Sequence, residues 1–228
     1  ILEDFNIIFE KNYINYLIGK SGSGKSSVGS MILKFIRPNS GTIFINEKNI
    51  EEIDTNAFRD LIRYVPKESI FYDLSVKENI KFFRKNISDE EVSNICNLLK
   101  MDFVESLSNG IDTPIGPSGN ELSRGERIMI SLARALVVNP KILILDEIYL
   151  KLDSETCNHI DKILHDLCKK MIVIFLTNKI NFSDLNDKKK KLFFLNKGTI
   201  DHNMLNKILN KMDYDNDNDK SENEKSIE

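Results

Sequence analysis

A nine-residue segment near the start of the chain, Gly19–Ser27 with the sequence GKSGSGKSS, restricts the possible folds more than any other feature. It matches the pattern G-x-x-x-x-G-K-[ST], which ends here at Gly24, Lys25 and Ser26. Glycines remove the side chains that would block successive backbone N–H groups, so a loop of this pattern can close around phosphate oxygens. The apolar run Ile14–Ile18 leads directly into it. A strand, a phosphate-binding loop and a helix are therefore predicted in that order.

The side chains at the end of this loop indicate what it binds. Lys25 would place its charge beside the β- and γ-phosphates of a nucleotide, which also makes it a candidate catalytic residue. The Ser26 hydroxyl is a candidate ligand for Mg²⁺. The residues expected to contact the phosphates are Gly19, Ser21, Gly22, Ser23, Gly24, Lys25, Ser26 and Ser27.

A second candidate site follows the apolar run ILIL, where Asp146 and Glu147 are adjacent. Parallel strands deliver ligand-binding residues to their carboxyl ends, so Asp146 is a candidate Mg²⁺ ligand, directly or through water. Glu147 would polarise the water that attacks the γ-phosphate, which is the role of a general base. The alternative is that Asp-Glu merely ends a strand at the surface. The phosphate loop upstream favours the metal and catalytic roles.

The segment Leu122–Arg127, LSRGER, precedes this pair and resembles the signature motif of the ATP-binding cassette (ABC) family, which usually reads LSGGQ. Ser123 is expected to cap the helix that begins there. The resemblance implies a further role, in which Ser123, Gly125 and Glu126 reach the ATP bound to a second cassette, so that two cassettes enclose two ATP molecules. Arg124 replaces a glycine; it either adds a cation near that nucleotide or points to solvent.

The stretch Asp112–Gly119 resembles the segment that precedes the signature in exporter-type ABC proteins, where it contacts the membrane domain. The matching segments extend from Phe5 to about Ile200. The resemblance implies an ATP-hydrolysing cassette that binds ATP and Mg²⁺, pairs with a second cassette, and powers export at the cytoplasmic face of a membrane. The first residue is Ile1 rather than Met, so we expect a transmembrane domain in the same, longer polypeptide.

Two positions depart from the family pattern. Lys67 stands where a glutamine usually offers an oxygen to Mg²⁺; an ammonium has no acceptor, so it would pair with a phosphate, with an acidic side chain, or turn to solvent. Asn178 stands where a histidine usually reaches the γ-phosphate, and as a candidate catalytic residue it would donate one neutral hydrogen bond. One alternative is therefore a regulatory cassette of a heterodimer that hydrolyses ATP slowly. Another is an ABC ATPase without a transport function.

Apolar runs of strand length alternate with helical patterns, which predicts a mainly parallel sheet covered by helices. With the resemblance, the expected fold is a P-loop α/β core with a small antiparallel β subdomain and an inserted helical subdomain at about residues 76–138. The ABC domain is expected to span residues 1–210, followed by an acidic, disordered tail at 211–228. The net charge of −3 provides no basic field for nucleic acid.

Several local predictions can be compared with the structure. Phe5–Phe9 is predicted to be a short β-rich run and Thr55–Ile62 a helix. Ser88 begins a capping box ahead of an amphipathic helix. The lysine run Lys188–Lys191 is interpreted as a solvated loop rather than a membrane-surface patch. A short helix is expected near Met204–Leu209.

Overall fold

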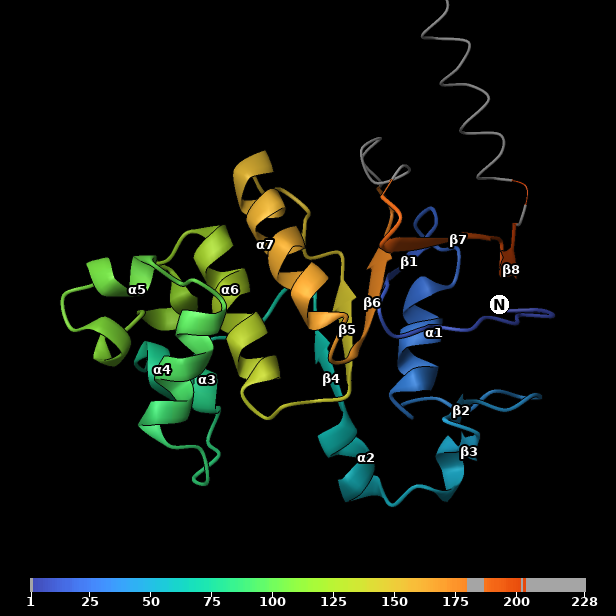
Figure 1. The fold of residues 1–228 in the computed structure, drawn as a ribbon, viewed down its shortest axis with the longest axis horizontal. Coiled ribbons are helices and arrows are strands. Elements are labelled where there is room, and N and C mark those ends of the chain that lie inside the picture. The colour runs from blue at the N-terminus through green and yellow to red at the C-terminus, as the bar shows by residue number, and fades with distance from the viewer. Residues whose placement is uncertain (1, 180–186, 202, 204–228) are drawn as a thin grey trace, which may run out of the picture.

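The computed structural model describes residues 2–179, 187–201 and 203 of the 228-residue chain. Figure 1 shows a central sheet with helices on both sides and a further group of helices at one end. The strands of the main sheet are β1 (Ile14–Ile18), β4 (Ile62–Val65), β5 (Ile142–Asp146), β6 (Ile172–Thr177), β7 (Lys190–Asn196) and β8 (Thr199–Ile200). A small second sheet pairs β2 (Phe44–Ile45) with β3 (Lys48–Asn49) in antiparallel fashion.

The α-helices are α1 (Lys25–Ile32), α2 (Thr55–Leu61), α3 (Val76–Lys81), α4 (Asp89–Leu98), α5 (Phe103–Ser106), α6 (Arg124–Leu136) and α7 (Ser154–Leu167). Short 3₁₀ turns lie at Ile50–Glu52, Gly110–Asp112 and Pro117–Gly119. The expected P-loop α/β fold, with a mainly parallel sheet, a small antiparallel sheet and inserted helices, is confirmed.

The main sheet has the strand order β4-β5-β6-β1-β7-β8; β8 runs antiparallel to β7, and the other pairs are parallel. Parallel pairing brings the carboxyl ends of the strands to one edge. Ile18 lies opposite Thr177, and Val65 lies opposite Leu145. The phosphate loop after β1, Asp146 at the end of β5, and the segments that follow β4 and β6 consequently meet at that edge.

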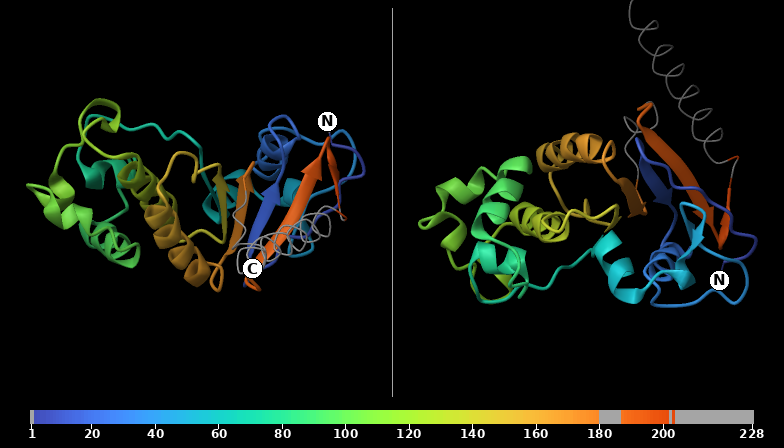
Figure 2. Two further views of the ribbon diagram at one scale, coloured as in Figure 1. Left: turned by 90° about the horizontal axis from the view of Figure 1, so that it is seen from above. Right: turned by 60° about the horizontal axis from the view of Figure 1, so that its bottom comes forward.

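Different helices cover the two faces of the sheet (Figures 1 and 2). Val28 of α1 and Phe58 of α2 belong to one apolar cluster. Leu132 of α6 and Leu164 of α7 belong to a larger cluster on the other face. Strand residues alternate between the clusters because successive side chains point to opposite faces, which is why the strands are almost continuously apolar. The larger cluster continues into α3, α4 and α5, so the helical end and the sheet share one core.

Two of the helices in the described residues begin with a full capping box. In α4, the Ser88 hydroxyl accepts from the Glu91 N–H, and a Glu91 carboxylate oxygen accepts from the Ser88 N–H at 2.8 Å. In α6, Ser123 and Glu126 make the same pair of bonds. Both predicted caps are confirmed, and each supplies partners for N–H groups that a helix leaves unbonded at its start.

Three local predictions are corrected. Phe5–Phe9 forms no strand; Phe5, Ile7 and Phe9 instead pack on the sheet, Phe9 edge-on against Phe193 with ring centroids 5.8 Å apart, while Ile8 is exposed. Ile62 is not helical, because it pairs with Ile142 as the first residue of β4. The solvated-loop interpretation fails for Lys190, whose side chain is 3% exposed in β7 and pairs with Asp161 at 2.8 Å.

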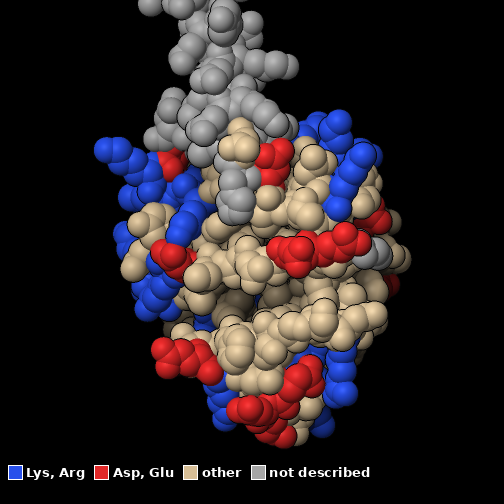
Figure 3. All heavy atoms as spheres, turned by 90° about the vertical axis from the view of Figure 1, so that its right-hand side faces the viewer, with Lys and Arg blue, Asp and Glu red and all other residues tan. Residues whose placement is uncertain are grey.

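The predicted helix near residues 204–209 and the acidic tail at 211–228 lie outside the described residues. Within those residues, no helix has the length and apolar character needed to cross a membrane. Figure 3 views the molecule from the side of β7 and β8, where acidic and basic side chains are interspersed.

Candidate functional site

The phosphate loop joins β1 to α1 at the carboxyl edge of the sheet, and its shape depends on glycine. Gly22 (φ 79°) and Gly24 (φ 111°) have a left-handed backbone that other residues rarely adopt. A Cβ added to Gly19 would lie 2.5 Å from the carbonyl oxygen of Leu195 in β7, which is closer than atoms can approach. The glycine pattern of the sequence therefore reflects two different needs, backbone conformation and close packing.

Lys25 is the first residue of α1, and its ammonium folds back over the loop. Its Nζ donates to Gly19 O at 2.6 Å and to Lys20 O at 3.1 Å, and the residue is only 6% exposed. Burial lowers the pKa of Lys25, and the carboxylates of Glu147 and Asp146 partly oppose that shift. A lysine is thus held at the loop, within electrostatic reach of both acidic residues.

The loop also offers donors and open space that suit a chain of phosphates. In the part of the chain that the structure describes, the backbone N–H groups of Lys25, Ser26 and Ser27 have no acceptor. The buried Ser23 hydroxyl has no partner there either. A methyl group on Gly22 would meet nothing within 4 Å, so the space beside the loop is free. Unbonded donors at a helix N-terminus, next to a lysine, fit a triphosphate.

Asp146 ends β5 and accepts a hydrogen bond that sequence reasoning did not identify. The Tyr64 hydroxyl, from the neighbouring strand β4, donates to Asp146 Oδ2 at 2.6 Å. Burial raises the pKa of Tyr64, and the hydrogen bond to Asp146 raises it further, so the hydroxyl stays protonated. The position of Tyr64 one residue before the end of the adjacent strand was the available signal. This bond occupies Oδ2 and leaves Oδ1 for a metal or a water.

The donor set fits Mg²⁺ only if the nucleotide contributes ligands. Among the described residues, no group of three or more His, Cys, Asp and Glu side chains is arranged to hold a metal ion alone. Mg²⁺ commonly takes one or two protein oxygens and completes its shell with phosphates and water. Asp146 Oδ1 and the exposed Ser26 hydroxyl could provide those protein oxygens.

Glu147 is held in place by its backbone and by Lys67. It has a left-handed backbone (φ 48°), and its N–H donates to Leu176 O in β6 at 2.8 Å. Its carboxylate Oε2 lies 3.3 Å from Lys67 Nζ. Of the three possibilities that the sequence left open for Lys67 (a phosphate, an acidic side chain or solvent), the structure shows the acidic side chain. Asn178 is exposed directly after β6, and within the described residues no hydrogen bond joins it to Glu147.

The residues of the LSRGER segment, Leu122–Arg127, are not bonded to the phosphate loop or to the acidic strand end within the described residues. Ser123 and Glu126 form the α6 cap, and a Cβ on Gly125 would lie 3.2 Å from Thr156 at the start of α7. Arg124 Nε donates to Leu150 O at 2.8 Å, so Arg124 binds the chain after Glu147 rather than pointing away to solvent. In the described residues, no hydrogen bond or ion pair joins this helix start to the phosphate loop.

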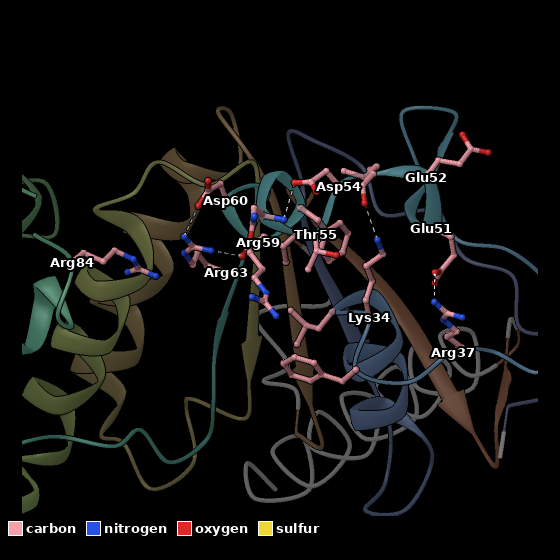
Figure 4. A pocket seen from close by; sticks show the side chains of 16 residues that line it. Lys34, Arg37, Glu51, Glu52, Asp54, Thr55, Arg59, Asp60, Arg63 and Arg84 are labelled. Carbon is pink, nitrogen blue, oxygen red and sulfur yellow. Dashed lines mark hydrogen bonds and ion pairs between the residues drawn. The ribbon is translucent and has the colours of Figure 1, made fainter. Parts of the chain in front are cut away.

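A cleft of about 970 Å³ lies away from this edge (Figure 4). Its lining comes mainly from the segment after α1, from α2 and from the start of β4. Two of its cations pair with acids of the same cleft: Arg63 lies 3.4 Å from Asp60, and Arg37 lies 3.3 Å from Glu51. The phosphate loop and the acidic strand end take no part in it.

A glycine-rich loop between a parallel strand and a helix, with an acidic pair at a nearby strand end, defines a P-loop protein that binds nucleoside triphosphates. Comparison with known proteins gives the family. Residues 2–149 match the ABC transporter family, and the chain belongs to it. It is an ATP-binding cassette of the exporter type, as the resemblance implied.

The relatives are longer proteins. The chain is 41% identical over 156 residues to the ATP-dependent permease MDL1 of Candida albicans, covering 68% of this chain and 23% of the permease. It is 33% identical over 187 residues to the mitochondrial ATP-binding cassette sub-family B member 10 of Mus musculus, covering 79% and 26%. A bacterial Atm1-family ABC exporter with ATP bound superposes with a TM-score of 0.78 at 27% identity, covering 88% of this chain and 35% of the exporter. The chain therefore spans about a quarter to a third of such proteins.

Proposed function

We propose that this cassette binds MgATP, pairs with a second cassette, hydrolyses the ATP and powers export through a transmembrane domain. The observation that carries the proposal is the meeting of the phosphate loop, Asp146 and Glu147 at one edge of the sheet. Family membership supports ATP as the nucleotide.

Binding begins at the loop. The free N–H groups of Lys25, Ser26 and Ser27 would donate to phosphate oxygens, and Lys25 Nζ would turn from its two loop carbonyls to the β- and γ-phosphates. The other loop residues that we propose to line the phosphates are Gly19, Ser21, Gly22, Ser23 and Gly24. Ser26 and Asp146 would hold Mg²⁺, which when bound neutralises charge on the transferring phosphate.

Hydrolysis requires a positioned water. Glu147 would orient that water and take its proton, because its carboxylate lies at the strand end next to the proposed metal ligand. The fixed backbone of Glu147, bonded to Leu176 O, restricts where the carboxylate can reach. Asn178, which follows the neighbouring strand, would donate one neutral hydrogen bond to the terminal phosphate.

The pairing of cassettes follows from the signature residues. Ser123, Gly125 and Glu126 begin α6 beside the start of α7, without a described bond to the phosphate loop of their own chain. We propose that they contact ATP held by a second cassette in a head-to-tail pair. Helix α6 would then direct the positive end of its dipole at that nucleotide.

The transmembrane domain is proposed from the relatives, which include a permease and of which two are about four times as long as the stretch matched here. We place it in the same polypeptide and the cassette at the cytoplasmic face of the membrane. We propose residues 1–210 as the cassette, with residues 76–138 as its helical subdomain, and 211–228 as a separate acidic tail.

The test uses the full-length polypeptide in lipid vesicles, with ATP hydrolysis and binding measured together. We expect Mg²⁺-dependent turnover that falls about 100-fold or more in Glu147→Gln, since general-base catalysis contributes roughly 10²–10⁴-fold. Glu155→Gln, an exposed acid of α7, is the matched control and should turn over at the normal rate. Normal turnover in Glu147→Gln would remove Glu147 from the mechanism. Failure to bind ATP at all would contradict the proposal as a whole.

A further inference from the structure

Lys67 lies where two parts of the site meet. It follows β4 by two residues, and its Nζ lies 3.3 Å from Glu147 Oε2. The Glu147 side chain is 16% exposed, whereas that of Lys67 is 45% exposed. The ion pair therefore joins an acid fixed inside the site to a cation on a flexible stem that is open to solvent.

Glu147 stands within reach of two lysines. Glu147 and the phosphate loop are both bonded to the end of β6, since the Glu147 N–H donates to Leu176 O at 2.8 Å and the Gly19 N–H donates to Thr177 O at 3.1 Å. The Glu147 carboxylate also opposes the lowering of the Lys25 pKa by burial. Lys67 approaches the same carboxylate from the end of β4. A phosphate bound by Lys25 on the side of Glu147 therefore comes within range of the Lys67 ammonium.

We infer that Lys67 is a specificity-determining residue that recognises the terminal phosphate of ATP and so separates ATP from ADP. The inference rests on the ATP site proposed above. Without nucleotide, the ammonium pairs with Glu147. With ATP bound, one of its three N–H donors turns to a γ-phosphate oxygen while another stays on Glu147. ADP carries no phosphate at this end of the site, so it gains nothing from Lys67.

The charge balance favours this role. Asp146 and Glu147 would repel a γ-phosphate, and Lys25 alone offsets only one of them. Lys67 adds a second cation where a glutamine would add none, and a charge-assisted bond to phosphate is about twice as strong as a neutral one. Because this cation is part of the chain, its contribution does not require a divalent metal. The effect of Lys67 should thus be largest when Mg²⁺ is removed.

The experiment measures the Kd of ATP and of ADP by titration calorimetry in EDTA at low salt, where hydrolysis does not occur. We expect Lys67→Gln to raise the Kd for ATP about threefold to tenfold and that for ADP less than twofold. Lys67→Arg, which keeps the charge, should retain most of the preference for ATP. Lys141→Gln is the matched control, because Lys141 is exposed at the opposite end of β5 from Asp146.

The outcomes separate this inference from the function on which it rests. Equal losses for ATP and ADP, or no loss for either, would overturn a γ-phosphate contact while leaving the ATP site intact. No ATP binding by any variant, with Mg²⁺ restored, would overturn the proposed site and the inference together. Thermal unfolding of each variant without nucleotide checks that it is folded, which the exposure of Lys67 leads us to expect.

A second arm asks whether Lys67 only screens Glu147. In a Glu147→Gln background the acid carries no charge to screen, so a purely screening lysine would have no remaining effect there. A lysine that contacts the phosphate would still separate ATP from ADP. We therefore expect Lys67→Gln to lower the ATP/ADP preference in both backgrounds. A loss confined to the chain with intact Glu147 would overturn the direct contact.

Discussion

Asp146 and Glu147 are adjacent in the chain, yet different side chains hold their carboxylates. The Tyr64 hydroxyl donates to Asp146 at 2.6 Å, and the Lys67 ammonium lies 3.3 Å from Glu147. Both partners come from the end of β4 and the residues just after it. A neutral donor on the proposed metal ligand and a cation on the proposed base give two neighbouring acids different chemical surroundings.

The hydrogen bond from the Tyr64 hydroxyl to Asp146 should contribute to the stability of the fold. Tyr64→Phe removes the hydroxyl and keeps the ring, so the free energy of unfolding without nucleotide should fall by about 1–2 kcal/mol, because a hydrogen bond to a charged group contributes roughly 1.5–3 kcal/mol and water can replace part of it. Burial raises the pKa of Tyr64, so the loss should be constant across neutral pH. Unfolding by urea measures this decrease in the free energy of unfolding. Tyr72→Phe, at a residue 39% exposed, is the control; an equal loss there would contradict the argument.

The residues of the site were predictable to different degrees. The loop from Gly19 to Ser27 and the acidic strand end could be identified, because backbone geometry and strand polarity fix where such residues lie. The pairing of Lys67 with Glu147 could not be predicted, because contacts between distant segments determine the direction of a four-carbon side chain. The place of Tyr64 near the end of a predicted strand was a signal, but its bond to Asp146 also depends on the pairing of β4 with β5, which the sequence did not predict.

At the scale of elements, the capping boxes of α4 and α6 have the same geometry but different surroundings. Ser88 and Ser123 each satisfy the start of a helix. Ser88→Ala and Ser123→Ala should each lower the free energy of unfolding by about 1 kcal/mol. Only Ser123→Ala should also weaken ATP-dependent pairing of cassettes, which light scattering of a Glu147→Gln protein can follow. Equal pairing in both variants would argue that α6 does not face a second nucleotide.

A pH-dependent contact joins α3 to α4. Hydrogen bonds from Lys81 at 2.5 Å, and from Lys77 at 2.9 Å, lower the pKa of Asp89 to about 2. Because the folded pKa lies below the unfolded one, the contribution is complete above about pH 4 and is lost as the pH falls toward about 2. Asp89→Asn should therefore flatten the acid dependence of stability in this window, most clearly at low salt. Asp73→Asn, at an exposed acid, should leave the slope unchanged.

Local sequence patterns predicted some features of the elements correctly and others wrongly. The caps at Ser88 and Ser123 were predictable because their bonds are local. Phe5–Phe9 has the composition of a strand, but Phe5, Ile7 and Phe9 are partly buried by packing on the sheet without any strand pairing. Lys190 belongs to a charged run yet lies buried, because β7 places it beside Asp161. Such outcomes depend on tertiary contacts that a local pattern does not contain.

At the scale of the whole molecule, one core runs from the sheet into the helical end. The larger apolar cluster includes Leu143 of β5 and Phe175 of β6 together with Ile80 of α3 and Val92 of α4. Alternation of strands and helices predicted the layers of the sheet. It did not predict that the inserted helices would share this core, because their apolar faces alone do not say what they pack against.

Substitution of Arg134 in α6 would test whether the molecule unfolds as one unit. It donates to Asn79 O and Ile70 O at 2.8 Å each, and its guanidinium lies over the Phe71 and Phe82 rings. Arg134→Ala should lower the free energy of unfolding by about 3 kcal/mol, since three bonds from a charged donor, the third a long one to Asn79 Oδ1, and two ring contacts are lost.

With a shared core, that loss should spread beyond the helical end. Native-state hydrogen exchange should show the same decrease in α6 and in the strand β1, which Arg134 does not contact. Arg127→Ala is the control, because within the described residues the Arg127 guanidinium makes one longer bond, to Gly119 O at 3.3 Å, and its loss should change both regions only slightly. A decrease confined to α3–α6 would show that the helical end opens separately, in which case the continuous cluster would not couple the two parts of the fold.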